Sequence, residues 1–286
     1  MAQFDQAKSY ASQEETFFDD GREEELVEFV RNHPDRSRIQ GSPAKVLQAI
    51  DEYGRTKRYL MNVGEDKGAI VTNIIKENNP QVMVELGGYC GYSTILFGSA
   101  VRAAGGKKYY SLERSPKFAK VITTLVEFAG LDGFVEVIVG PSNEGIQILH
   151  SKGLKSIDMM FLDHYKPAYT TDLKLCEQLG LINKGTVLAA DNVISPGNPP
   201  YLEYVRSSVE EKLQKLKLEG KLDTDNFAKR SATQYGDVEA LNTELKGNPS
   251  IIYESQLINS FEPTGEPDGV EITRCMGDIE GSRSGT

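Results

Sequence analysis

The side chains of this chain most suited to chemistry are oxygen donors at the ends of two apolar runs. The run MMFLD ends at Asp163, and VLAAD ends at Asp191, which Asn192 follows. Runs this apolar are typical of strands buried in mid-sheet, whose carboxyl ends share one crevice. Two carboxylates and a carboxamide form a hard oxygen site that suits Mg²⁺. Helix capping is the alternative role for Asp and Asn at such positions.

A glycine-containing turn, ELGGYCGYST, follows an earlier apolar run. Glycine lets a ligand approach the backbone closely, and the start of a helix offers unpaired N–H groups. The spacing is not GxGxxG, which disfavours a dinucleotide oxidoreductase. Glu85 at the strand end suits a ligand with positive charge, and Glu113 ends the next run, where a carboxylate can accept hydrogen bonds from ribose hydroxyls. These features predict a nucleoside without a diphosphate, most commonly S-adenosylmethionine; a packing turn and a surface Glu are the alternative.

Lys166 and His164 lie just beyond Asp163. Like-charge repulsion from a metal ion and a sulfonium would favour the neutral amine of Lys166, which could then act as a general base. A solvated surface lysine is the ordinary alternative. His164 could bind a metal or hydrogen-bond a cofactor ring, and we do not assign it to the metal.

The elements that must position these residues alternate along the chain. Five apolar runs predict strands at 81–86, 108–113, 135–140, 157–163 and 186–191. The segments between them predict helices at 92–104, 116–129, 143–152 and 168–179. This alternation indicates βαβ units and a mostly parallel sheet. Outside this series we expect helices at 21–33, 42–60, after Gly64 and at 199–218, and strands at 250–257 and 269–276.

The domain prediction is a single domain over 21–277, because no Pro/Gly/Ser-rich linker divides the strand series. Residues 1–20 are polar and acidic, so we expect a flexible arm, and 278–286 predict a disordered tail. The formal charge of −10 disfavours a binder of nucleic acid or of anionic membranes. Three cysteines without finger spacing disfavour a disulfide scaffold or a zinc knuckle. With no signal-like start, we predict a cytoplasmic protein.

The order of these motifs resembles the catechol O-methyltransferase family. The matching strings are VLQAIDEY, MNVGEDKG, ELGGYCGYS, VEFAGL, FLDHYK, KGTVLAADNV, ISPG and DGVEITRCMG. They cover roughly residues 20–206 and 250–277, and the combination is specific, whereas ELGGYCG alone would indicate only a methyltransferase-type fold. The resemblance implies a Rossmann-like class I methyltransferase sandwich: a mostly parallel seven-stranded sheet flanked by helices, with extra N-terminal helices. We expect a monomer that acts on a small molecule.

The resemblance also implies residue roles. The residues implied to contact S-adenosylmethionine are Val63, Glu85, Gly87, Tyr89, Ser93, Glu113, Ser142, Asn143, Asp163 and His164, with Glu113 at the ribose and Asn143 and His164 near the adenine. The implied Mg²⁺ ligands are Asp163, Asp191 and Asn192, and the implied base is Lys166. The implied substrate contacts are Tyr59, Met61, Tyr165, Lys166, Asn192, Pro196 and Glu262.

The implied activity is Mg²⁺-dependent transfer of a methyl group from S-adenosylmethionine to one hydroxyl of a catechol. Mg²⁺ would chelate both vicinal oxygens and lower the pKa of a phenol, normally about 10. Lys166 would take the proton, and Glu262 would hydrogen-bond the second hydroxyl. Alternatives are another metal-dependent O-methyltransferase, of the caffeoyl-thioester type, and a non-catalytic S-adenosylmethionine-binding protein.

The chain departs from the family in its aromatic walls and in one insertion. Tyr59 and Tyr165 stand where animal enzymes carry Trp, which reduces the aromatic contact area. An insertion at about 209–249 replaces a short connection, and loops absorb such length at small cost. Glu262 lies six residues before Asp268, as in the family, but Glu266 and Glu271 are close rivals for its role, and Pro263 follows Glu262 where the family has no proline.

Overall fold

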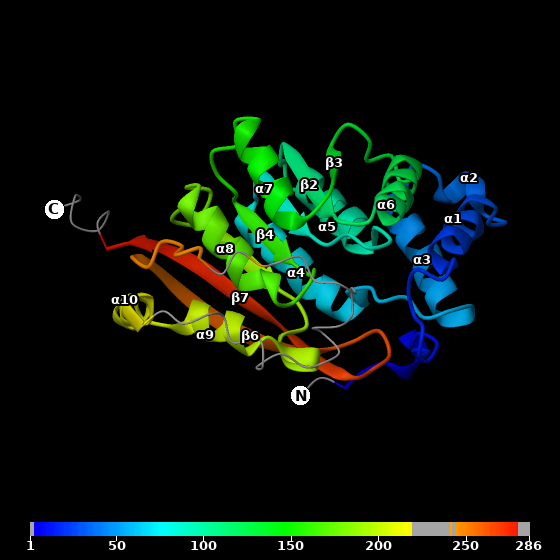
Figure 1. Ribbon diagram of the computed structural model, residues 1–286. Helices are drawn as coiled ribbons and strands as arrows, with labels where there is room; N and C mark the ends of the chain where they lie inside the picture. The colour runs from blue at the N-terminus through cyan, green and yellow to red at the C-terminus, as the bar shows by residue number, and fades with distance from the viewer. Residues whose placement is uncertain (1–2, 219–240, 242–243, 280–286) are drawn as a thin grey trace. The chain divides into compact units, whose positions relative to one another are not determined.

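The computed structural model describes residues 3–218, 241 and 244–279, and the chain divides by its contacts into two compact units (Figure 1). The first unit comprises Met1–Pro141 and Asn259–Asp268, and the second comprises Ser142–Ile258 and Gly269–Thr286. Much of the expected insertion at 209–249, and most of the expected disordered tail at 278–286, lie outside the described residues. The predictions of a single domain and of a flexible arm stay predictions.

The first unit contains three parallel strands: β1 (Val82–Leu86), β2 (Lys108–Glu113) and β3 (Val135–Val139). The helices α5 (Tyr92–Ala103) and α6 (Pro116–Phe128) are the crossovers that parallel pairing requires. Leu86 pairs with Leu112, so the turn after β1 and the acid that ends β2 lie at the same edge of the sheet. Backbone pairing continues one step beyond the strand, because the Gly87 N–H donates to the Leu112 carbonyl.

The N-terminal helices of this unit are α1 (Arg22–Arg31), α2 (Arg36–Ile39), α3 (Pro43–Thr56) and α4 (Gly64–Asn78). Figure 1 shows α1, α2 and α3, drawn in blue, gathered together, with α1 packed on α3 and α6. Helix α4 packs on α5. Pro43 occupies the first turn of α3, where its missing N–H is harmless. The expected extra helices are therefore present.

The second unit contains β4 (Met159–Leu162) and β5 (Val187–Ala190), which are parallel. It also contains β7 (Pro267–Asp278) from Gly269 onward, and β7 pairs antiparallel with β5. Strand β6 (Ile251–Phe261) completes the order β3-β2-β1-β4-β5-β7-β6. The helices of this unit are α7 (Ser142–Ser151), α8 (Ala168–Gln178), α9 (Pro199–Arg206) and α10 (Val209–Leu218). The seven-stranded, mostly parallel α/β sheet flanked by helices confirms the predicted fold class.

Several elements differ from the sequence prediction. The helix expected over 42–60 ends at Thr56. The single helix expected over 199–218 is interrupted at Ser207 and Ser208, giving α9 and α10. Strands β6 and β7 are longer than predicted, because their alternating polar residues extend the hairpin beyond its apolar core. The short helix α2 was missed. Among the residues that the structure describes, none of the helices has the length and apolarity needed to cross a bilayer.

Candidate functional site

In the first unit, the turn after β1 is bound to the carboxylate of Glu113. The N–H groups of Gly88 and Tyr89 donate to Glu113 Oε2 at 3.1 and 2.9 Å, and the Ser115 N–H donates to Oε1 at 2.8 Å. Glu113 is buried, and burial raises its pKa against the opposing effect of these backbone donors. Its carboxylate therefore has a fixed direction at the edge where the glycine turn opens.

Tyr89 holds an uncommon backbone conformation inside this turn, with φ of 49°. A left-handed conformation in a non-glycine residue costs of order 1–3 kcal/mol and clusters at ligand sites. The Tyr89 hydroxyl donates to Glu23 Oε1 at 2.9 Å, which anchors the residue to α1. Gly87 and Gly91, on either side, also have positive φ, and Ser93 is buried in the first turn of α5.

Glu85 is fully buried between β2 and α5. Its Oε2 accepts from the hydroxyls of Thr94 at 2.5 Å and Ser111 at 2.7 Å. These bonds give Glu85 a role in holding the helix start against the sheet. Its predicted contact with a cofactor stays a prediction.

Two predicted substrate residues of this unit lie before α4. Tyr59 is buried and packs edge-on against Phe17 with ring centroids 6.1 Å apart, and its carbonyl accepts from Arg22 at 2.6 Å. Met61 is half-buried, and the buried Val63 directly precedes α4.

Glu262 lies in a buried ionic cluster of the first unit. The ammonium of Lys67, which is fully buried, donates to Glu262 Oε1 at 2.8 Å and to Asp268 Oδ2 at 2.9 Å. Two carboxylates around one ammonium leave an excess negative charge away from water. Burial, with the Asp268 charge acting against the Lys67 charge, raises the pKa of Glu262 to about 7.

The rivals of Glu262 have other surroundings. Glu266 is exposed. Glu271 is fully buried in the second unit, where Arg206 holds both of its oxygens at 2.7 Å and the Ser255 hydroxyl donates to one of them. An exposed carboxylate and a bidentate-paired one are both poor candidates for a substrate contact, which favours Glu262.

In the second unit, two of the three predicted metal ligands, Asp163 and Asn192, contact the ammonium of Lys166. Its Nζ donates to Asp163 Oδ1 at 3.1 Å, Asn192 Oδ1 at 2.8 Å and the Tyr169 hydroxyl at 2.8 Å. Asp191 is buried, and its Oδ1 accepts from the Asn192 N–H at 2.8 Å. The structure therefore brings the oxygens of Asp163 and Asn192 together at the ammonium of Lys166. Asp191 accepts from the backbone of Asn192 beside them.

Among the residues that the structure describes, no three His, Cys, Asp or Glu side chains gather as a metal-binding group. The predicted set has only two carboxylates and relies on the carboxamide of Asn192 as its third donor.

Two of the predicted cofactor contacts, Ser142 and His164, meet at Asp172 on α8. Asp172 Oδ2 accepts from the Ser142 hydroxyl at 2.5 Å and contacts His164 Nε2 at 2.8 Å. A carboxylate is an acceptor only, so this contact requires a proton on Nε2. Nδ1 is buried without a hydrogen-bond partner among the described residues, and the ring stacks on Tyr169.

The other predicted residues of this unit are more accessible. Asn143, at the start of α7, is exposed, and Tyr165 is half-buried in the segment before α8. Pro196 is exposed in the π-helical turn Val193–Gly197.

The sequence analysis missed four residues that hold the predicted ones: Lys67, Tyr169, Asp172 and Asn198. Asn198 is fully buried, and its amide donates to the Lys166 carbonyl at 2.8 Å while its oxygen caps α9. Asp172 and Lys67 lie inside helices, with no strand-end or glycine motif beside them. The only sequence signal for these residues was that Lys67 lies inside the family-matching string MNVGEDKG. That match did not predict that Lys67 is buried.

Comparisons with known proteins identify relatives of this chain. A family model described as a methyltransferase domain matches residues 84–193. Catechol O-methyltransferase of Bos taurus is 41% identical over 188 residues, covering 65% of this chain and 67% of the relative. Catechol O-methyltransferase B of Danio rerio is 40% identical, covering 65% and 69%. The transmembrane O-methyltransferase of Homo sapiens is 35% identical, covering 65% and 62%.

Solved structures share the fold at low sequence identity. The O-methyltransferase TomG from Streptomyces achromogenes superposes with a TM-score of 0.54 at 19% identity, covering 91% of this chain and all of that one. An O-methyltransferase from Bacillus cereus gives 0.52 at 16% identity, covering 88% and 90%. At such identities the likeness shows the fold alone.

Proposed function

Because the chain belongs to the catechol O-methyltransferase family, we propose that it methylates one hydroxyl of a catechol with Mg²⁺ as its metal cofactor. The broader class, an S-adenosylmethionine-dependent O-methyltransferase acting on a small molecule, follows from family membership. The observation that carries the proposal is the convergence of Asp163 and Asn192 oxygens on the buried ammonium of Lys166.

The first unit fits S-adenosylmethionine, which supplies an electrophilic methyl group on a cationic sulfur. Two buried carboxylates, Glu85 and Glu113, flank a glycine turn at a helix start, which suits a cationic nucleoside better than a pyrophosphate. We assign the ribose hydroxyls to Glu113. The remaining cofactor contacts proposed are Val63, Gly87, Tyr89, Ser93, Ser142, Asn143, Asp163 and His164.

The donor set of the second unit fits Mg²⁺. Its members are hard oxygen donors, and two of them already bind a cationic group, the Lys166 ammonium. Asp163, Asp191 and Asn192 would hold the ion. When bound, Mg²⁺ supplies positive charge that favours ionisation of a phenolic hydroxyl.

The chain's own residues then have distinct tasks. Lys166 Nζ would take the proton of the attacking hydroxyl, and its backbone is fixed by Asn198. Glu262 would hydrogen-bond the second hydroxyl. Tyr59, Met61, Tyr165 and Pro196 would hold the ring. Since an anion and a cation become neutral in this transfer, most of the acceleration should come from holding the reactants close and aligned.

The test is methyl transfer from labelled S-adenosylmethionine to a simple catechol, with Mg²⁺ and with a chelator. We expect product from the catechol, loss of product with the chelator, and none from a monohydric phenol, which has one oxygen. Product with the chelator present would overturn the metal assignment. Methylation of a caffeoyl thioester but of no free catechol would overturn the substrate assignment. The monomeric state and the cytoplasmic location stay predictions.

A further inference from the structure

The N-terminal arm, residues 3–20, packs against the turn that carries Glu262. The Tyr10 N–H donates to the Pro263 carbonyl at 2.9 Å, and the rings of Phe4 and Phe261 lie 5.6 Å apart. Phe4 is buried and lies so close to Gly265 that a Cβ there would come within 2.8 Å of its ring. The arm therefore covers both ends of the turn from Phe261 to Gly265.

Tyr10 anchors the arm to the helical layer. Its hydroxyl donates to Asp51 Oδ1 at 2.6 Å, and the Ala11 N–H donates to the Gly54 carbonyl at 2.9 Å. Gly54 leaves room for the Tyr10 ring, because a Cβ at that position would come within 2.5 Å of it. Lys8 adds an ion pair to Glu65 at 2.8 Å. A buried tyrosine with a charged acceptor is a stronger anchor than surface ion pairs.

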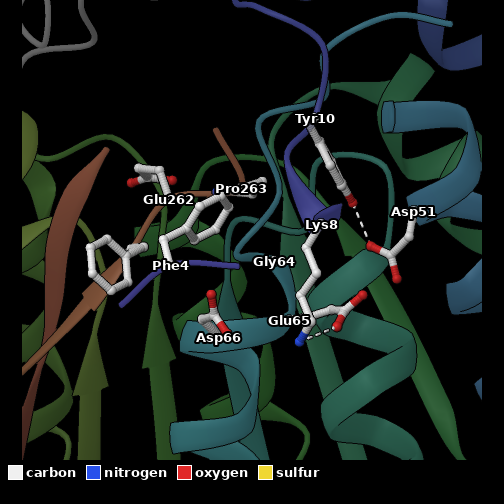
Figure 2. Close-up of a pocket in the computed structure, with 10 residues that line it drawn as sticks. Phe4, Lys8, Tyr10, Asp51, Gly64, Glu65, Asp66, Glu262 and Pro263 are labelled. Carbon is white, nitrogen blue, oxygen red and sulfur yellow. Dashed lines mark hydrogen bonds and ion pairs between the residues drawn. The ribbon is translucent and has the colours of Figure 1, made fainter. Parts of the chain in front are cut away.

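Two backbone hydrogen bonds close the turn at Glu262. The Glu262 N–H donates to the Glu266 carbonyl at 2.8 Å, and the Gly265 N–H donates back to the Glu262 carbonyl at 2.8 Å. Figure 2 shows the residues that line a pocket, with Phe4, Pro263 and Glu262 toward one end and Tyr10 and Lys8 toward the other. Phe4 packs against Phe261 and Gly265, so its motion would change the support of the turn that carries Glu262.

The same arm also supports Tyr59. Phe17 packs on the Tyr59 ring, while Arg22 donates to the carbonyls of both Tyr59 and Thr16, at 2.6 and 2.8 Å. Arg22 is fully buried and pairs with Asp20 at 2.8 Å. The arm therefore reaches two residues assigned to the substrate.

We propose that the N-terminal arm is part of the substrate site, with Phe4 and Tyr10 as positioning residues that fix the direction of the Glu262 carboxylate. This rests on the proposed function, in which Glu262 binds the hydroxyl that is not methylated. In a catechol with two different hydroxyls, that contact decides which oxygen faces the methyl group. The arm then sets the ratio of the two monomethyl products.

The test compares wild type with Phe4→Ala, Tyr10→Phe and the exposed arm control Gln6→Ala, using 3,4-dihydroxybenzoate. For Phe4→Ala and Tyr10→Phe we expect the ratio of the two products to change about threefold or more, with a raised KM for the catechol. For Phe4→Ala the Kd for S-adenosylhomocysteine should stay within about twofold, since Phe4 packs against Phe261 and Gly265 and not against the glycine turn. Phe4→Leu should restore the ratio. Gln6→Ala should match wild type.

An unchanged product ratio and KM in folded Phe4→Ala and Tyr10→Phe would overturn the proposal. If wild type methylates no catechol, the proposed function fails instead. The arm is then tested by carbon-13 NMR titration of the Glu262 carboxyl, which faces Lys67 and Asp268. A titration midpoint that moves in Phe4→Ala, but not in Gln6→Ala, supports the positioning role. An unmoved midpoint overturns it.

Discussion

The substitution Lys67→Met removes the ammonium from the buried cluster with Glu262 and Asp268. Methionine keeps the length of the side chain, so the main loss is charge and hydrogen bonding. Lys67 and Asp268 have side chains that are 0% exposed, and that of Glu262 is 17% exposed. Removing one partner of a buried ion pair costs roughly 3–5 kcal/mol, because the remaining charge stays away from water.

The size of this loss should depend on pH through Glu262. Its pKa is about 7 in the folded protein against an ordinary value of 4.5, so the folded state holds a proton that the unfolded state releases first. The stability that this proton contributes, about 3 kcal/mol, is complete below pH 4.5 and is lost as the pH rises through 7. Because the Lys67 charge lowers the pKa of Glu262, its removal raises that pKa further. Above pH 7 the variant therefore continues to lose stability as the pH rises while wild type does not, and at pH 5.5 Glu262 is largely neutral in both.

The assay is urea unfolding of wild type and Lys67→Met at pH 5.5 and pH 8.0, followed by circular dichroism. We expect the free-energy loss to be larger at pH 8.0. Glu262→Gln should flatten the pH dependence without the large loss, because one carboxylate then matches one ammonium. Lys117→Met is the matched control: its ion pair with Asp19 has the same length, 2.9 Å, but is exposed, so no measurable change is expected. A loss below about 1 kcal/mol at pH 8.0, or an equal loss at both pH values, would refute the reasoning.

Three further predictions concern the proposed reaction. Lys166→Met should bind both ligands but lose turnover by roughly 10²–10⁴-fold, and a retained rate at neutral pH would remove it from the base role. Glu113→Ala should weaken S-adenosylhomocysteine binding about tenfold or more in calorimetry, since hydrogen bonds to a charged group are lost. An unchanged affinity would show that Glu113 does not bind the ribose. Asp172→Asn should also weaken that affinity, because an amide oxygen has less charge with which to hold both Ser142 and His164; a Kd equal to wild type would limit Asp172 to packing.

The sheet was predictable because each strand carries its own signal. The runs at 82–86, 108–113 and 187–190 are apolar, short and separated by helix-length segments, so local pattern and topology agree. The predicted boundaries of helices and strands were wrong where the sequence carries no local signal. Ser207 and Ser208 divide α9 from α10 with neither glycine nor proline to mark the break, and the hairpin of β6 and β7 outlasts its apolar pattern.

The candidate site was predictable to the extent that its residues follow strands. Glu113, Asp163 and Asp191 stand at strand ends, which parallel topology places at one edge within each unit. Residues that position another side chain do not follow a strand, so they have no comparable sequence signal. Asp172 lies on α8 and becomes relevant only when Ser142, 30 residues away in sequence, folds against it. Contacts of this range depend on the final packing, which spacing along the chain does not encode.

The spacing between Glu262 and Asp268 was predictable only in part. In the sequence it was only a match to a family pattern, with Glu266 and Glu271 as alternatives. In the structure, the two carboxylates stand on either side of the turn between β6 and β7, and both accept from one ammonium, that of Lys67. A shorter or longer turn would move one of them away from Lys67 and leave a buried charge unpaired, which is costly. The six-residue interval is thus a physical requirement of the cluster, and it explains why a carboxylate belongs at position 262 even though Pro263 departs from the family pattern.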